Sequence, residues 1–170
     1  MKILLYELQS GNGPLHLEET LSNLGLGEFG ESRTVNIELH PQVHGDDLFL
    51  NGTVHANLDL PCDRCLTTTQ QTIEAKLALW LLAEERPDLD PDEQELVLVQ
   101  PGQREVDLSG LVAESILLEK PSKVLCQADC RGFCSNCGAD LNRGHCDCPQ
   151  NEMDGRWSDL IEIKQKLEGK

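Results

Sequence analysis

The segment CQADCRGFCSNCGADLNRGHCDC, residues 126–148, holds six of the eight cysteines of the chain. Within it, Cys134 and Cys137 form a C-x-x-C pair. In such a knuckle, two thiolates hold one metal ion while backbone N–H groups of the turn point at the sulfurs. Gly138 comes next and supplies the left-handed residue that the turn requires. The segment therefore predicts a metal-stapled lobe instead of an ordinary apolar core.

The cysteine spacings predict two sets of four thiols, because four thiolates complete the closed tetrahedral shell of a structural zinc site. The downstream set joins the C-x-x-C pair to the last two cysteines: Cys134, Cys137, Cys146 and Cys148. The upstream set joins the pair in PCDRCL to the two remaining cysteines: Cys62, Cys65, Cys126 and Cys130. The sequence predicts one Zn²⁺ in the downstream set, as the tighter site, and allows a second Zn²⁺ in the upstream set.

Cysteines in such clusters have uses other than zinc binding. Secreted disulfide scaffolds carry an export signal, whereas MKILLYEL has one lysine and too short an apolar run, so we expect reduced thiols. An iron–sulfur cluster, unmetallated thiols, His145 as a replacement ligand and a redox dithiol at Cys62 and Cys65 stay open. A redox C-x-x-C normally opens a helix, but this pair lies between two alternating apolar runs, which predicts a hairpin.

Alternation of apolar and polar residues predicts an antiparallel sheet. Three runs have the period of two that a half-buried strand shows: residues 33–39, 48–60 and 73–81. Turns are expected between them, at 44–47 and at the Cys62/Cys65 pair. Outside these runs we expect a first strand at 2–8, a short helix or irregular segment at 15–24, and a last strand at 96–99.

Two helices are predicted around this sheet. Asp107 and Ser109 open the first, whose apolar residues recur at helical spacing until Pro121 stops it. The second runs from about Trp157 to Leu167, capped by Asp154 or Ser158.

The predicted fold class is α+β: an antiparallel β-meander of about five strands covered by a helix, with a C-terminal Cys-rich, zinc-ribbon-like lobe. The predicted domains are an acidic sheet domain at 1–121 and a metal-binding lobe at 122–170, packed together as one unit.

The net charge of −16 is unevenly distributed. Residues 1–119 contain six basic and twenty-two acidic residues, whereas residues 120–170 contain eight of each. Affinity for nucleic acids comes from Lys and Arg that neutralise phosphates, so the acidic part repels RNA and favours a basic partner. The acidic segment 84–95 is either a solvated loop or a mimic of nucleic-acid charge. No apolar run approaches membrane-spanning length, so we expect a soluble, cytoplasmic protein without a membrane partner.

Four segments together are similar to a known family: CDRCL at Cys62–Leu66, VDLSGLVAESILLEKP at Val106–Pro121, LCQADCRGFCSNCGADLNRGHCDC at Leu125–Cys148 and DGRWSDL at Asp154–Leu160. The chain resembles the YceD-like proteins, named for accumulation of 23S ribosomal RNA and associated with biogenesis of the large ribosomal subunit in bacteria and plastids. The resemblance implies a ribosome-biogenesis role and leaves the molecular mechanism open.

Three functions from different classes follow. The first is a non-catalytic assembly factor with structural zinc, whose acidic body holds a basic protein of the ribosome-assembly machinery, any contact with ribosomal RNA being secondary. The second is a direct RNA-binding zinc protein that uses basic residues of the tail: Arg131, Arg143, Arg156, Lys164, Lys166 and Lys170. The third is a thiol-redox protein using Cys62 and Cys65. We favour the first, because a fully thiolate-ligated zinc has no open position to activate water and no catalytic constellation or small-molecule substrate is indicated.

Overall fold

The computed structural model describes residues 1–10, 13–90, 95–148, 160 and 163–164. Two compact units make up the chain, Met1–Ala128 and Asp129–Lys170. The predicted division into 1–121 and 122–170, with both parts packed together as one unit, stays a prediction. The helix expected from about Trp157 to Leu167 falls almost wholly outside the described residues. Across the described ranges, no helix combines the length and apolar character needed to cross a membrane.

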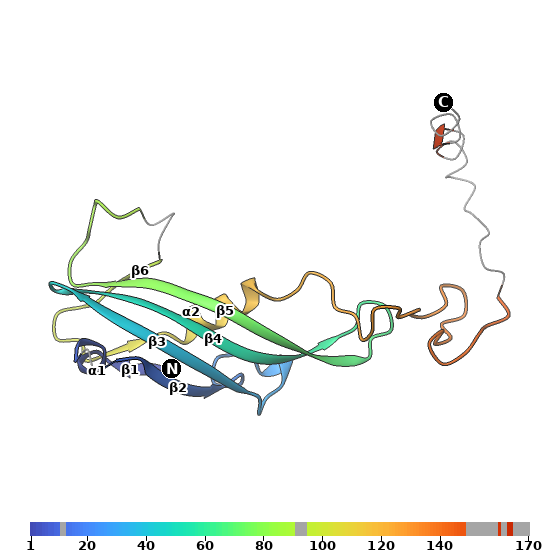
Figure 1. Ribbon diagram of the computed structural model, residues 1–170, viewed down its shortest axis with the longest axis horizontal. Helices are drawn as coiled ribbons and strands as arrows, with labels where there is room; N and C mark the ends of the chain where they lie inside the picture. Colours follow the sequence, from blue (N-terminus) through green and yellow to red (C-terminus); the bar gives the residue numbers. More distant parts are fainter. Residues whose placement is uncertain (11–12, 91–94, 149–159, 161–162, 165–170) are drawn as a thin grey trace. The chain divides into compact units, whose positions relative to one another are not determined.

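A five-stranded sheet of order β2-β3-β4-β5-β6 dominates the first unit (Figure 1). Its strands are β2 (Leu15–Thr20), β3 (Thr34–His44), β4 (Asp47–Pro61), β5 (Thr68–Leu82) and β6 (Glu95–Leu98). The first four pair antiparallel with their neighbours, which confirms the predicted α+β class and the meander of the three alternating runs.

Strand β6 departs from the expected meander, because it runs parallel to β5, with Leu79 opposite Glu95 and Leu82 opposite Leu98. A parallel neighbour needs a connection of a dozen or more residues, which the chain between Leu82 and Glu95 provides. The strand predicted at 96–99 is therefore present, but its direction is reversed.

Two expectations near the N-terminus are wrong. The strand predicted at 2–8 is limited to β1 (Lys2–Leu4), and helix α1 (Leu5–Gln9) follows it. Leu5 and Leu8 lie three residues apart and are both buried, which is the spacing of one helix face. The segment 15–24, expected to be helical or irregular, begins with β2, which is stabilised by its ladder to β3.

The remaining elements connect the sheet to its covering helix. Strand β7 (Glu105–Asp107) pairs antiparallel with β1 as a second, two-stranded sheet. Helix α2 (Ser109–Leu118) follows β7 directly and ends before Pro121, as the sequence predicts. A short 3₁₀ helix spans Gly27–Phe29.

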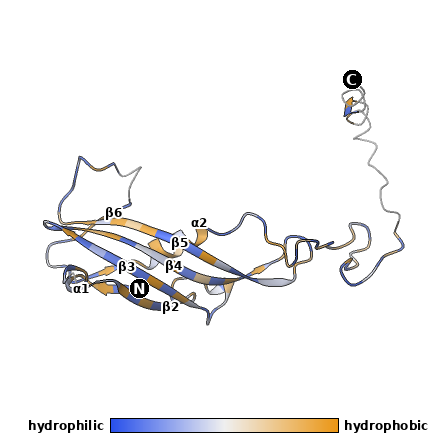
Figure 2. Ribbon diagram, in the orientation of Figure 1, coloured by the Kyte–Doolittle hydropathy of each residue, from blue (hydrophilic) through white to orange (hydrophobic). Residues whose placement is uncertain are grey.

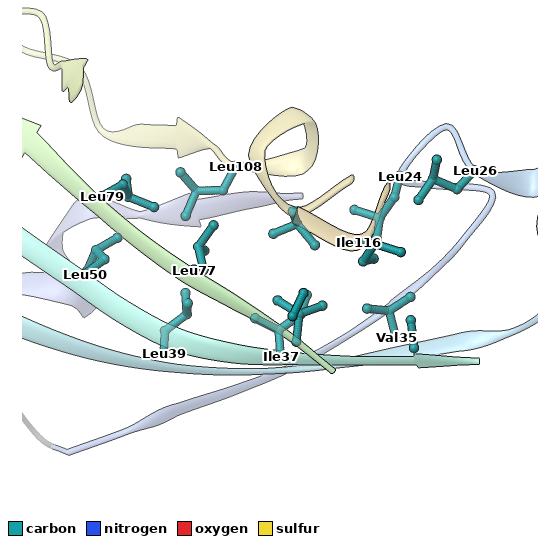
Figure 3. Packing of buried hydrophobic residues seen from close by; sticks show 14 of the residues in the cluster. Leu24, Leu26, Val35, Ile37, Leu39, Leu50, Leu77, Leu79, Leu108 and Ile116 are labelled. Atoms are coloured by element: carbon teal, nitrogen blue, oxygen red, sulfur yellow. The ribbon is translucent and has the colours of Figure 1, made fainter. Parts of the chain in front are cut away.

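The hydrophobic core lies between one face of the sheet and helix α2. Figure 3 shows Ile116 of the helix facing Val35 and Ile37 of the sheet, with Leu24 beside it, and Leu77 packed near Leu39, Leu50 and Leu79. Figure 2 shows the strands alternating between hydrophobic and hydrophilic colour along their length, as expected for a sheet with one buried face. The three alternating runs therefore place their apolar residues on the side that α2 covers.

Gly52 fixes how closely β3 and β4 approach. It lies opposite Leu39 in the ladder, and a Cβ atom at this position would lie 2.2 Å from the carbonyl oxygen of Glu38 and 2.9 Å from a methyl carbon of Leu39. Backbone cannot yield as a flexible side chain does, so the two strands would have to separate. A residue without a side chain is required here for steric reasons.

We predict that Gly52→Ala lowers the free energy of unfolding by about 1–3 kcal/mol, the usual cost of overpacking. The matched control is Gly110→Ala in α2, where an added Cβ meets nothing within 4 Å. Removing glycine from a helix stabilises by up to about 1 kcal/mol, so the control should gain stability. Denaturant unfolding of both variants measures the difference, and equal stabilities would contradict the close approach of β3 and β4.

Candidate metal centres

Cys62 and Cys65 lie in the tight connection between β4 and β5. Pro61 pairs with Thr68 at the end of the ladder, and inside it Cys62 N–H donates to the carbonyl of Thr67 at 2.9 Å. Leu66 N–H donates back to the carbonyl of Cys62 at 2.9 Å. The pair therefore lies in a hairpin, as predicted, and not at the start of a helix as in a redox motif.

Cys134 and Cys137 repeat this geometry in the second unit. Cys134 N–H donates to the carbonyl of Ala139 at 2.8 Å, and Gly138 N–H donates to the carbonyl of Cys134 at 2.9 Å. A β-bridge between Phe133 and Asp140 closes the turn. Each bond matches one in the upstream hairpin at the same offset from the first cysteine, so the chain builds the same knuckle twice.

The residue after each second cysteine adopts the left-handed conformation. Gly138 has φ of 73° and Leu66 has φ of 56°. Glycine takes this conformation freely, whereas a side chain costs roughly 1–2 kcal/mol there. The Leu66 side chain is 68% exposed, so its own packing does not explain the conformation. The shape of the knuckle imposes it.

Asp63 holds the segment that follows α2 beside the hairpin of Cys62 and Cys65, the first knuckle. Its N–H donates to the carbonyl of Val124 at 2.8 Å, and its Oδ2 accepts from the N–H of Val124 at 2.6 Å. Cys126 follows two residues later, and its Sγ lies 3.5 Å from Sγ of Cys65. This two-point contact brings together cysteines that are 61 residues apart in sequence.

The sulfur atoms gather in the two sets that the spacings predict. In each set, one ligand atom from every residue lies within 4.8 Å of all the others: Cys62, Cys65, Cys126 and Cys130 in the first cluster, and Cys134, Cys137, Cys146 and Cys148 in the second cluster. All eight cysteines belong to the described part of the chain, and none of them forms a disulfide. His145 is in neither set.

Zinc fits these clusters by distance and by donor type. A tetrahedral ion with Zn–S bonds of about 2.3 Å places its sulfurs about 3.8 Å apart. The 3.5 Å separation of the Cys65 and Cys126 sulfurs and the 4.8 Å limit within each set are close to that figure. Four soft thiolates suit zinc or an iron–sulfur cluster better than a hard cation. Both clusters could therefore hold a metal ion, and its identity as zinc stays a prediction.

The first thiol of the first cluster is readily ionised. Burial of Cys62 acts to raise its pKa, but backbone hydrogen bonds from Arg64, Cys126 and Cys65 outweigh burial and lower the pKa to about 6. For Cys65, the nearby hydroxyl and backbone of Thr67 lower the pKa. The knuckle thus stabilises thiolates, the form in which cysteine binds metal.

In the second cluster, the pKa of one thiol is again lowered, but the pKa of another is raised. Backbone hydrogen bonds from Cys137 and Asn136, with a side-chain hydrogen bond from Cys146, lower the pKa of Cys134 to about 6. The hydrogen bond with Cys137, burial and the neighbouring Cys134 raise the pKa of Cys148 to about 12. Without a cation, the negative charges of four thiolates would repel one another, and a bound cation would offset that repulsion.

Cys130 has a polar support that the sequence analysis missed. Nδ2 of Asn142 lies 3.5 Å from Sγ of Cys130, and Oδ1 of Asn142 accepts from the N–H of Arg131 at 2.7 Å. Asp140 in turn accepts from the backbone N–H of Asn142 at 3.0 Å. Outer contacts of this kind orient metal ligands. Neither Asn142 nor Leu66 carries a pattern that spacing alone could identify.

The chain was compared with known proteins. Residues 50–164 match the family described as "Large ribosomal RNA subunit accumulation protein YceD". A chloroplastic protein of Arabidopsis thaliana, "Large ribosomal RNA subunit accumulation protein YCED homolog 1", is 27% identical over 148 residues, which cover 72% of this chain and 46% of that protein. The chloroplastic YCED homolog 2 of the same plant is 25% identical over 171 residues, covering 92% of this chain and 71% of that protein.

Relatives also occur outside plants. An uncharacterised protein of Mycobacterium leprae is 26% identical over 132 residues, covering 76% of this chain and 58% of that protein. The chain spans between 46% and 61% of the length of the first curated relatives it matches. No solved structure matches the chain significantly.

The strained turn residue gives the first prediction for these centres. Leu66→Gly should raise the free energy of unfolding by up to about 1 kcal/mol, because the relief of left-handed strain exceeds the entropic cost of glycine. Gly138→Leu, the reciprocal change, should weaken metal binding at the second cluster. Denaturant unfolding and a zinc competition assay measure the two effects. Loss of stability in Leu66→Gly would show that the turn is not set by the knuckle.

The different burial of the clusters gives the second prediction. Three of the four cysteines of the first cluster are buried, Cys126 being the exception, whereas none of the four in the second cluster is buried. Protein with both clusters loaded should therefore release zinc to a chelator in two phases, and the second cluster, which the spacings predict as the tighter site, should release its ion faster than the first because its thiols are more accessible. Cys137→Ser should abolish the fast phase and Cys65→Ser the slow one. A single phase, or less than two equivalents by elemental analysis, would contradict two occupied centres.

Proposed function

This chain belongs to the YceD family of large ribosomal RNA subunit accumulation proteins, and from that membership we propose that it is a non-catalytic factor in assembly of the large ribosomal subunit. In this proposal it supports accumulation of 23S ribosomal RNA in the cytoplasm by binding a basic protein of the assembly machinery. Structural zinc at the two cysteine clusters maintains its fold.

The negative charge of the first unit is the observation that supports a basic protein as the partner. Residues 1–119 contain twenty-two acidic and six basic residues, and two of the basic ones form salt bridges. Arg33 lies 2.8 Å from Asp59, and Arg86 lies 2.7 Å from both Asp47 and Asp88. The exposed charge is therefore negative, which attracts a basic protein and repels a phosphate backbone within roughly a Debye length, about 8 Å at physiological salt.

The low burial of residues 129–148 supports a structural role for zinc. Within residues 129–148, only Cys130 and Gly132 are buried. So little apolar burial cannot offset the conformational entropy of an ordered loop. A four-thiolate zinc site supplies on the order of 10 kcal/mol of apparent binding free energy, which is enough to order such a segment. This supports a zinc-ribbon-like lobe, in which the metal takes the place of a hydrophobic core.

Direct RNA binding by the tail is the second candidate. Arg131 and Arg143 are exposed and could meet phosphates, although Arg143 lies 3.3 Å from Asp140. The other basic residues that this alternative names lie outside the described ranges, except Lys164. Because neighbouring carboxylates weaken phosphate contacts, we expect RNA binding by this protein alone to be weak.

Affinity recovery from extract, with and without ribonuclease, tests the proposal. We expect one basic ribosome-assembly protein to be recovered in both conditions, and only weak binding to naked 23S fragments at physiological salt. An unrelated protein of similar size and charge serves as the control for nonspecific capture. Sub-micromolar affinity for naked RNA, or recovery that ribonuclease abolishes, would instead support the direct RNA binder.

A further inference from the structure

Strand β6 presents an open edge of the five-stranded sheet. It is the last strand in the sheet order, so within the residues that the structure describes it is paired on one side, with β5 (Figure 1). Val99 N–H donates to the carbonyl of Leu82 at 2.8 Å. In a parallel ladder, residues bond alternately to either side, so the N–H and C=O groups of Leu96 and Leu98 point toward the open edge. Such an edge is a template for another strand.

An apolar pocket of about 550 Å³ adjoins this edge. Its apolar lining comes from β5, β6 and the segment between them: Leu82, Pro87, Leu89, Leu96 and Leu98. The Leu98 side chain is 48% exposed. A strand placed along β6 would therefore find hydrogen-bond partners for its backbone and a pocket for apolar side chains on one of its faces.

The segment that forms one wall of the pocket is anchored. Nη1 of Arg86 donates to Oδ2 of Asp47 at 2.7 Å, and Nη2 donates to Oδ2 of Asp88 at 2.7 Å. The other oxygen of Asp47 accepts from the N–H of Ala83 at 3.0 Å. These bonds tie the segment to the start of β4, so the pocket wall is formed before any ligand arrives and binding needs little further ordering.

The rim of the pocket is strongly acidic. Glu85 lines the pocket, and four more carboxylates belong to the segment that forms its wall or to the start of β6: Glu84, Asp88, Asp90 and Glu95. Arg86 is the one basic residue among the described residues of this segment, and it is already paired with Asp47 and Asp88. The rim therefore selects for Lys or Arg next to the apolar residues of a ligand.

We propose that the open edge of β6 binds an extended segment of a basic protein as an additional strand of the sheet. Apolar side chains of that segment enter the pocket, and alternating Lys or Arg residues meet the acidic rim. This inference rests on the proposed function and specifies how the basic partner is recognised. Main-chain bonding supplies affinity, whereas the pocket and the rim supply selectivity.

A synthetic peptide that alternates valine and lysine is the probe. Titrated into the full chain at physiological salt, it should bind and should slow hydrogen exchange at the amides of Leu96 and Leu98. The control peptide has the same sequence with alternate backbone nitrogens methylated, which removes hydrogen-bond donors without changing charge. It should bind at least about tenfold more weakly, a difference of about 1.4 kcal/mol. Equal binding of both peptides, or protection away from β6, would overturn the proposal.

Paired variants separate this edge from general charge attraction. Glu85→Lys should weaken binding of the alternating peptide about tenfold, whereas Glu74→Lys, which changes net charge equally on the exposed surface of β5, should change it little. Leu98→Ser should also weaken binding, in contrast to Leu118→Ser on the exposed side of α2. Equal effects of Glu85→Lys and Glu74→Lys would reduce the binding to nonspecific electrostatics and overturn the proposal.

The same variants distinguish failure of this inference from failure of the proposed function. If the unmodified chain recovers a basic assembly protein from extract and Glu85→Lys and Leu98→Ser recover it equally, the partner binds elsewhere and the β6 site is wrong. If the unmodified chain recovers no basic protein, the proposed function itself fails. Loss of recovery in both variants, together with protection of Leu96 and Leu98 by the peptide, supports both.

Discussion

The antiparallel pairing of β4 and β5 is the interaction on which the rest of the structure depends. It runs from Leu48 opposite Leu81 to Pro61 opposite Thr68. A register error of one residue would turn the apolar residues of a strand to the other face, so α2 would lose the surface it covers. The same ladder ends at the Cys62 hairpin, and therefore the geometry of the first cluster is inherited from the sheet.

The two knuckles show how one local solution serves two environments. At the end of the sheet, the hairpin is fixed by long strands and the thiols are buried. In the second unit, a single bridge between Phe133 and Asp140 closes the turn, and little apolar surface surrounds it. The hydrogen bonds are the same in both cases, which indicates that the C-x-x-C spacing and the left-handed residue determine the turn. What differs is how much of the surrounding structure would survive without a metal ion.

Period-two alternation was sufficient to place β3, β4 and β5, and helical spacing placed α2, because each element has one buried face. The two groups of cysteines were also predictable. Once Cys134 and Cys137 are grouped with the two cysteines that follow them, the four remaining cysteines can form only one further set. The direction of β6 and the contacts between residues distant in sequence were not predictable. The parallel course of β6 depends on a connection whose path no local pattern specifies. Helix α1 was missed because Leu5 and Leu8 fit a short apolar strand equally well. The Asp63 contact with Val124 needs the tertiary fold to exist.

The separation of Cys65 and Cys126 by 61 residues has a consequence for the order of events during biosynthesis. The entropy of closing a long loop must be overcome before the first cluster exists, so it can form only once the sheet and α2 have brought Val124 to Asp63. The second cluster lies within a short stretch and needs no distant partner. Metal binding at the first cluster would therefore require that the sheet and α2 have already folded. Metal binding at the second cluster would require only that residues 134–148 have been synthesised.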